Sequence, residues 1–276
     1  MKVDFLKSLG VITCFTGLAC SAIANAQEAE SNGTEKKTAK QAWEALIQPN
    51  LKRFPAFKFV EQQEGLPNVL IYGDSISIGY TPTVQKQLAG KVNVYRVHCN
   101  GGHTKAFVPR MRQLARAMRS NQLSNPWDFK WDIIHVNVGL HDLKYVDDAK
   151  KLDKKNGKLV STPEQYKAGV KEVMEFLKKE HPDTQIIFAT TTPVPDGEAG
   201  RHQGDAEKYN KIALDLLKES YPNVVINDLY SFIKPHQKKV WIKPGDVHYS
   251  TKGKQMKGVE VAKVIANQLE TIKEEK

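Results

Sequence analysis

Short apolar runs alternate along the chain with longer segments in which apolar residues recur every three or four positions. The short runs predict strands at residues 69–72, 92–97, 132–138, 185–191 and 224–227. The longer segments predict helices at about residues 82–88, 104–119, 163–180, 205–220 and 251–272. A further short helix is expected around residues 42–47.

Regular alternation of strands and helices indicates parallel strands joined by right-handed crossovers, with helices on both faces of the sheet. We therefore predict an α/β fold, a three-layer α/β/α sandwich around a parallel five-stranded sheet. Ligands of such sheets bind beyond the carboxyl ends of the strands. Ser75 follows the first predicted strand, Gly102 the second and His141 the third, so the topology brings these three residues to one edge.

The first 26 residues have the pattern of a secretory signal peptide. Lys2 and Lys7 precede a short apolar stretch over residues 9–19, and Ala24-Asn25-Ala26 offers a cleavage site. The stretch is shorter than the roughly 20 residues that span a bilayer. We expect a secreted or periplasmic protein without a stable membrane anchor, in which a polar segment with a short helix (27–64) precedes one domain (65–272).

The three cysteines bear on this expectation. Cleavage after Ala26 removes Cys14 and Cys20 and leaves Cys99 alone, so no internal disulfide is expected. Lipid attachment at Cys20 stays open as an alternative, although Gly17 stands where a lipoprotein signal has leucine. We expect Cys99 to be a buried thiol and not a nucleophile.

The net charge of +10 includes +1 from the leader, which leaves +9 after cleavage. A basic balance can indicate nucleic-acid binding, but no nucleic-acid motif and no stripe of basic and aromatic residues is found. The segment 147–158 holds five lysines and follows the third predicted strand. It is expected either to be a solvated loop or to attract an anionic polymer at the rim of the site.

A serine and a histidine suggest nucleophilic catalysis. Ser75 ends a Gly-Asp-Ser triplet directly after the first strand, and His248 lies in Asp246-Val247-His248 before the last helix. A serine hydroxyl becomes nucleophilic when a neighbouring base takes its proton, and imidazole titrates near neutrality. Asp246 is the candidate for orienting that imidazole. Backbone N–H groups of Ser75 and Gly102 are candidate donors to the oxyanion that forms at the attacked carbonyl.

The chain resembles the SGNH (GDSL-type) hydrolases over residues 66–269. Four segments carry the resemblance: Gly73-Asp74-Ser75 as block I, Asn100-Gly101-Gly102-His103-Thr104 as block II, Gly139-Leu140-His141-Asp142 as block III and the Asp246–His248 segment as block V. The resemblance implies a flavodoxin-like fold and a serine esterase without cofactor or metal, with Ser75, His248 and Asp246 as catalytic residues. It also implies that Gly102 and His141 bind the oxyanion.

Two positions depart from the family pattern. His141 stands where block III has asparagine, and a neutral imidazole N–H can donate in its place. Asp246 stands two residues before His248, whereas the family has aspartate three before. Either Asp246 still reaches the ring, or a backbone carbonyl orients it as in a dyad. With Gly139-Leu140-His141-Asp142 and the Asp246-Val247-His248 ending, the chain resembles a bacterial branch of the family.

The resemblance implies ester hydrolysis, and for an exported member we expect removal of acetyl groups from a carbohydrate. Three alternatives stay open: a lysophospholipase or thioesterase that uses the same serine, a non-catalytic glycan-binding fold, and a metal site at His141 with His98, His103 or Asp142. The expected partner is an ester substrate and not nucleic acid.

Overall fold

Five parallel strands form the central sheet in the order β2-β1-β3-β6-β7, which confirms the predicted architecture. The strands are β1 (Asn68–Gly73), β2 (Asn93–Arg96), β3 (Ile133–Asn137), β6 (Gln185–Ala189) and β7 (Val225–Asn227). Every residue of β1 is buried, because helices cover both faces of the sheet. In the computed structural model, residues 36–127 and 130–274 are described, so the predicted leader lies outside the described residues.

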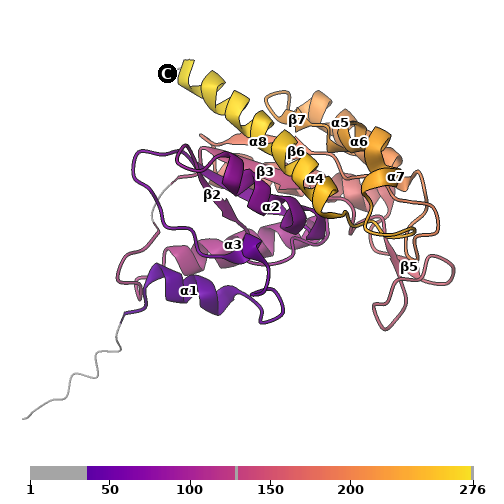
Figure 1. Ribbon diagram of the computed structural model, residues 1–276, viewed down its shortest axis with the longest axis horizontal. Coiled ribbons are helices and arrows are strands. Elements are labelled where there is room, and N and C mark those ends of the chain that lie inside the picture. Colours follow the sequence, from indigo (N-terminus) through magenta and orange to yellow (C-terminus); the bar gives the residue numbers. More distant parts are fainter. Residues whose placement is uncertain (1–35, 128–129, 275–276) are drawn as a thin grey trace, which may run out of the picture. The chain divides into compact units, whose positions relative to one another are not determined.

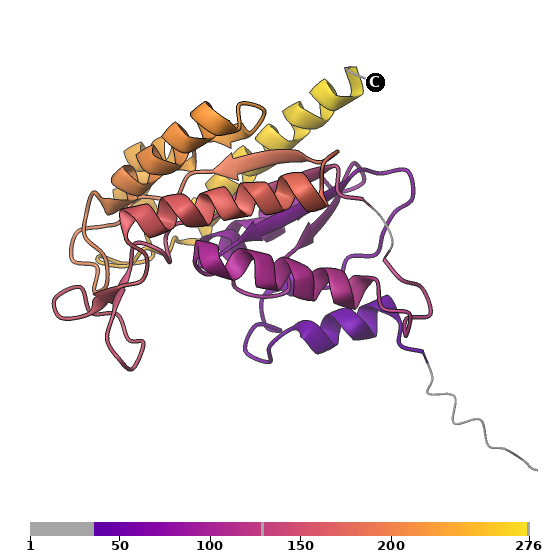
Figure 2. The same cartoon turned by 180° about the vertical axis from the view of Figure 1, so that it is seen from behind.

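The helices form two layers (Figures 1 and 2). The helices α2 (Ser75–Gln87) and α8 (Thr251–Glu274) pack together on one face. The opposite face carries α3 (Phe107–Met118), α4 (Pro163–Glu180) and α5 (Asp205–Ser220). This arrangement brings the carboxyl ends of all five strands, and the loops that follow them, to one edge of the sheet.

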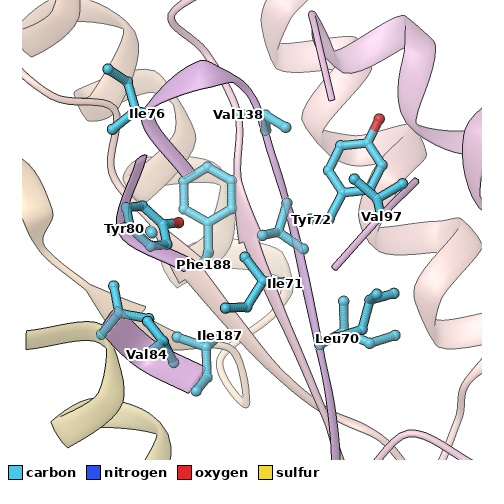
Figure 3. Packing of buried hydrophobic residues seen from close by; sticks show 14 of the residues in the cluster. Leu70, Ile71, Tyr72, Ile76, Tyr80, Val84, Val97, Val138, Ile187 and Phe188 are labelled. Atoms are coloured by element: carbon cyan, nitrogen blue, oxygen red, sulfur yellow. The ribbon is translucent and has the colours of Figure 1, made fainter. Parts of the chain in front are cut away.

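Side chains of β1 alternate between the two layers (Figure 3). Ile71 faces Tyr80, Ile187 and Phe188, whereas Leu70 and Tyr72 point to the other side of the strand. Residues from both layers are fully buried, and they form one continuous core with the strands. The fixed sheet therefore determines where the loops at its carboxyl edge begin.

The helix predicted at 82–88 starts seven residues earlier, at Ser75. Asp74 ends the strand-to-helix turn as the N-cap, and its Oδ1 accepts the Ile76 N–H at 2.8 Å. Pro82 lies inside α2, where the ring removes one helical hydrogen bond. Burial of Ile76 and Tyr80 against the core compensates for that loss, so the proline does not mark the start of the helix.

Smaller elements complete the described chain. The predicted N-terminal helix is α1 (Ala39–Leu46), and Trp43 on it donates from Nε1 to the Phe57 carbonyl at 2.8 Å. A two-stranded hairpin, β4 (Tyr145–Val146) with β5 (Lys158–Leu159), projects at the lower right of Figure 1. The others are η1 (Pro55–Phe57), η2 (Thr104–Ala106), α6 (Leu229–Ile233), η3 (Lys234–His236) and α7 (Gln237–Val240).

Two further expectations are addressed by the fold. Cys99 is buried, and burial raises the pKa of its thiol, as expected for an unreactive side chain. Over residues 36–127 and 130–274, no helix is long and apolar enough to cross a membrane.

Candidate active site

Ser75, His248 and Asp246 form one chain of hydrogen bonds although 173 positions separate the serine from the histidine. Ser75 Oγ lies 2.9 Å from His248 Nε2, and His248 Nδ1 lies 2.7 Å from Asp246 Oδ1. A carboxylate accepts only, so Nδ1 carries the proton and Nε2 is free to accept from the serine hydroxyl. This is the tautomer that a serine nucleophile needs.

Asp246 reaches the imidazole from two positions before it. Its Oδ1 accepts both the His248 backbone N–H at 2.9 Å and the ring Nδ1–H, so a tight local turn closes around the carboxylate. Burial acts to raise the pKa of the Asp246 carboxyl, but the hydrogen bonds from the His248 backbone and ring outweigh it and the pKa is lowered. The side chain therefore stays anionic at neutral pH, and no backbone carbonyl takes its place.

Glycines hold the loop that carries these two residues. Gly245 has φ of +71°, and a Cβ there would lie 2.9 Å from the Gly197 carbonyl oxygen. The backbone of block V thus packs directly on the loop after β6. Such close contact leaves no room for a side chain at position 245.

A buried arginine organises the turn before Ser75. The Arg96 side chain leaves β2 and is 1% exposed. Its two terminal nitrogens donate five hydrogen bonds of 2.7–3.1 Å to the following acceptors: the carbonyls of Gly73, Asp74, Val97 and Cys99, and Ser77 Oγ. Burial lowers the pKa of the Arg96 guanidinium to about 10, which leaves it charged at neutral pH. The guanidinium therefore joins the nucleophile turn to the loop after β2.

Block II approaches block I through its backbone. The Gly101 N–H donates to the Gly73 carbonyl at 2.8 Å, and a Cβ on Gly101 would lie 2.5 Å from that oxygen. Gly102 follows with φ of +64°, and its N–H donates to Asn100 Oδ1 at 3.1 Å. The candidate oxyanion donor is thus engaged in a local turn. The Ser75 N–H, at the start of α2, has no acceptor among the described residues.

Asp142 fastens block III to block II. Its carboxylate accepts from the Thr104 N–H at 3.0 and 3.2 Å, from Thr104 Oγ1 at 2.7 Å and from Ser161 Oγ at 2.9 Å. Burial raises the pKa of Asp142 to about 6 in spite of these hydrogen bonds. Asp142 therefore joins block III to block II directly beside His141.

His141 lies on the short turn between Gly139 and Leu143. Its Nδ1 is 3.3 Å from the Lys144 ammonium. Burial, together with the neighbouring cations Lys144 and Arg201, lowers the pKa of His141 to about 3, so the imidazole is neutral. Over residues 36–127 and 130–274, no three His, Cys, Asp or Glu side chains are grouped so that they could hold a metal ion.

Arg201 connects the loops on the far side of the site. Its Nε donates to the Leu140 carbonyl at 2.7 Å, and its Nη1 forms a buried ion pair of 2.8 Å with Glu198. The same loop accepts the Tyr145 N–H at 2.6 Å and the Lys154 N–H at 2.8 Å from the lysine-rich hairpin. The hairpin thus adjoins the loop after β6, next to block III.

The structure brings three of the five predicted site residues, Ser75, His248 and Asp246, into one chain of hydrogen bonds. Gly102 lies next to Gly101, which donates to the Gly73 carbonyl of block I. His141 lies on the adjoining loop. Two residues were missed: Arg96 and Lys144. No motif marks them, and for Arg96 the one signal was a charged residue inside the predicted strand at 92–97.

A groove of about 630 Å³ lies elsewhere, at the amino ends of β6 and β7. Its lining includes Asp132, Gln185 and Asn223. Strands of a parallel sheet place their ligands at the opposite edge, so this groove is separate from Ser75.

Residues 71–256 match the sequence profile of the GDSL-like Lipase/Acylhydrolase family, which includes the hydrogen-bonded Ser75 and His248. The chain belongs to this family. It is therefore a serine hydrolase that acts on esters, as the resemblance implied. No curated protein has a sequence that matches it.

Solved structures share the fold at low sequence identity. The lipase/acylhydrolase from Enterococcus faecalis is 16% identical with a TM-score of 0.54, over 74% of this chain and 97% of that one. The acetyl xylan esterase AlAXEase is 16% identical with a TM-score of 0.53, over 72% and 99%. Axe2, an acetylxylan esterase from Geobacillus stearothermophilus, is 14% identical with a TM-score of 0.51, over 71% and 93%.

Proposed function

We propose that the protein is an exported esterase that removes acetyl groups from a carbohydrate through a covalent acyl-enzyme at Ser75. The continuous hydrogen-bonded chain from Ser75 through His248 to Asp246 carries this proposal. Export rests on the sequence of residues 1–26 alone.

In the first half of the reaction, Ser75 Oγ attacks the acyl carbon while His248 Nε2 takes the hydroxyl proton. The carbonyl electron pair moves onto oxygen, and the carboxylate of Asp246 stabilises the imidazolium that forms. When the tetrahedral intermediate collapses, the bond to the sugar oxygen breaks and His248 gives its proton to that oxygen. The free alcohol leaves, and the acetyl group stays on Ser75.

Water completes the reaction. His248 removes a proton from the water as it attacks the acyl carbon, and the second tetrahedral intermediate releases acetate. The proton then returns to Ser75 Oγ, which restores the enzyme. The proposed reaction therefore uses the three triad residues, the oxyanion donors and one water molecule.

Three donors are proposed for the oxyanion: the N–H of Ser75, the N–H of Gly102 and the imidazole of His141. The Ser75 N–H is available because it opens helix α2 without an acceptor among the described residues. The Gly102 N–H has to exchange its neutral partner, Asn100 Oδ1, for the oxyanion. An anionic oxygen is the stronger acceptor, so substrate attack favours this exchange.

The acetyl group and the carbohydrate are supported by the acetyl xylan esterases among the proteins of similar fold. One fold hosts many substrates, so the substrate is tested directly.

The test is acetate release from acetylated xylan and from a short chromogenic acetyl ester, with wild type compared to Ser75→Ala. We expect release from both substrates by wild type and loss of both in the variant. The matched control is Ser220→Ala, since Ser220 is exposed at the end of α5, and this variant should keep wild-type rates.

The alternatives predict other outcomes. A preference for long acyl chains over acetyl would support a lysophospholipase or thioesterase instead. Turnover of the chromogenic ester without acetate from xylan would retain the mechanism but reject xylan as substrate. If Ser75→Ala binds glycan as wild type does and neither protein releases acetate, the non-catalytic glycan-binding fold is favoured.

A further inference from the structure

His141 occupies a position where the chemistry of the side chain depends on one proton. An asparagine amide always presents N–H donors, whereas a neutral imidazole has a single N–H that can be on either ring nitrogen. If the proton is on the nitrogen that faces away from the oxyanion, the other nitrogen presents a lone pair to a negative charge. Use of histidine in block III therefore requires control of the tautomer.

Lys144 supplies that control in its contact with the ring. Its ammonium lies 3.3 Å from His141 Nδ1. An ammonium has donors only, so Nδ1 must accept and the single proton of the neutral ring is on Nε2. Within residues 36–127 and 130–274, no carboxylate lies within ion-pair distance of the Lys144 ammonium. The imidazole of His141 is its hydrogen-bond partner.

The charges around the ring favour the neutral form. Burial disfavours an imidazolium most strongly, and the cations of Lys144, Arg201 and Arg110 act in the same direction, as does His103. A doubly protonated ring would have donors on both nitrogens and would need no tautomer control. Because this ring is neutral, the location of its proton decides what it can do.

The backbone on both sides of the contact is fixed. The Asp142 N–H donates to the Gly139 carbonyl at 2.8 Å, and the Val160 N–H donates to the Lys144 carbonyl at 2.9 Å. Arg201 Nε holds the Leu140 carbonyl at 2.7 Å, directly before His141. The imidazole and the ammonium are thus presented to each other by a rigid turn.

We propose that Lys144 is a positioning residue: by donating to His141 Nδ1 it keeps the proton on Nε2, and this Nε2–H replaces the asparagine amide as the third oxyanion donor. The inference rests on the proposed function, because it needs an oxyanion formed by Ser75 attack. It assigns to Lys144 a role through His141 and not through contact with the substrate.

The kinetic test places Lys144→Met in two backgrounds, wild type and His141→Asn, with the chromogenic acetyl ester as substrate. In wild type we expect kcat to fall about tenfold, less than the 10² to 10³ that follows loss of a whole oxyanion donor. In His141→Asn, which should itself keep measurable activity, Lys144→Met should change kcat less than about twofold, because an amide has no tautomer to control. Equal losses in the two backgrounds would overturn the proposal and indicate that the ammonium acts on the substrate directly.

Two control variants show whether a fall in kcat comes from the lost donor at position 144, from the lost charge alone or from unfolding. Lys171→Met removes the same charge from an exposed site on α4 and should keep wild-type kcat. Lys144→Arg keeps a donor and should recover part of the loss. If Lys144→Arg is as slow as Lys144→Met while both unfold at the wild-type temperature, a donor at this position is not what matters and the proposal fails.

The direct measurement is a long-range ¹H–¹⁵N correlation spectrum, which reports the protonated nitrogen of His141 without any turnover. We expect the proton on Nε2 in wild type and a shift toward Nδ1 in Lys144→Met. A proton on Nδ1 in wild type would overturn the inference. Failure of the proposed function would give a different result from failure of this inference. Ser75→Ala would then keep full activity, whatever the tautomer of His141.

Discussion

The turn that carries Ser75 and the loop that carries His248 meet at one hydrogen bond but are built differently. The turn is deeply buried: Asp74 is 2% and Arg96 1% exposed. In the base loop, the side chain of His248 is 47% exposed and that of Asp246 is 24% exposed. One half of the site therefore lies in the protein interior and the other half at the surface.

The contacts that hold the two halves differ accordingly. The nucleophile turn accepts three hydrogen bonds from a desolvated guanidinium, which donates two more to the loop after β2. The base loop depends on local bonds of Asp246 to His248, on the Ile242 N–H that donates to the His248 carbonyl at 2.9 Å, and on the glycine contact at Gly245.

This difference separates catalysis from stability. Removal of a group from a desolvated network leaves buried acceptors unpaired, whereas water can replace a lost partner at the surface. Substitutions in the base loop should therefore reduce activity and spare the fold. Substitutions beneath Ser75 should reduce both.

Among the substitutions that test this difference, Asp246→Asn should have the largest effect on activity. An amide can donate to the ring and stabilise the wrong tautomer of His248, so kcat for the chromogenic ester should fall by about 10² to 10⁴. The free energy of unfolding, measured with urea, should change by less than about 1 kcal/mol because the pair is partly exposed.

The companion variant Lys243→Gln removes a charge from the same loop without removing a triad group, and should keep activity near wild type. Should Asp246→Asn destabilise the protein by several kcal/mol, the base loop would be as integral to the fold as the nucleophile turn. The contrast between the two halves would then be wrong.

Arg96→Met is expected to act mainly on stability, with a smaller effect on kcat than Asp246→Asn. Loss of the guanidinium leaves buried carbonyls with fewer donors, so the free energy of unfolding should fall by about 3 kcal/mol or more. Activity should fall as well, because the turn before Ser75 loses its support. Urea unfolding and the rate with the chromogenic ester measure the two changes on one preparation.

Arg116→Met provides the matched control, because Arg116 is exposed on α3 and its loss should leave both quantities near wild type. A stable Arg96→Met protein with full activity would show that the turn holds Ser75 without the guanidinium.

Much of the fold could be predicted from local patterns. Strands buried on both faces appear as continuous apolar runs, and each of the five predicted strands overlaps an observed one. The start of α2 was wrong because Pro82 resembles a first-turn proline, while the true cap is Asp74, directly after the strand. The hairpin at residues 145–159 was missed because its strands are two residues long.

In the candidate site, the sequence predicted the motifs but not the contacts between separate segments. Motif order predicted which loops would meet, and the chain of hydrogen bonds from Ser75 to Asp246 joins the residues so chosen. The path from Asp246 to the ring was undecided in the sequence, because it depends on a two-residue turn and on Gly245 packing against Gly197. Arg96 was missed because its acceptors come from separate segments of the chain.

The central claim is that Ser75 is the nucleophile and that His248 activates it. The most direct measurement is peptide mass spectrometry after treatment with a fluorophosphonate, which phosphonylates activated serines as fluoride leaves. We expect one phosphonyl group on Ser75 in wild type, and much slower labelling in His248→Ala. Labelling of another serine, or equal labelling of Ser75 in both proteins, would contradict the claim.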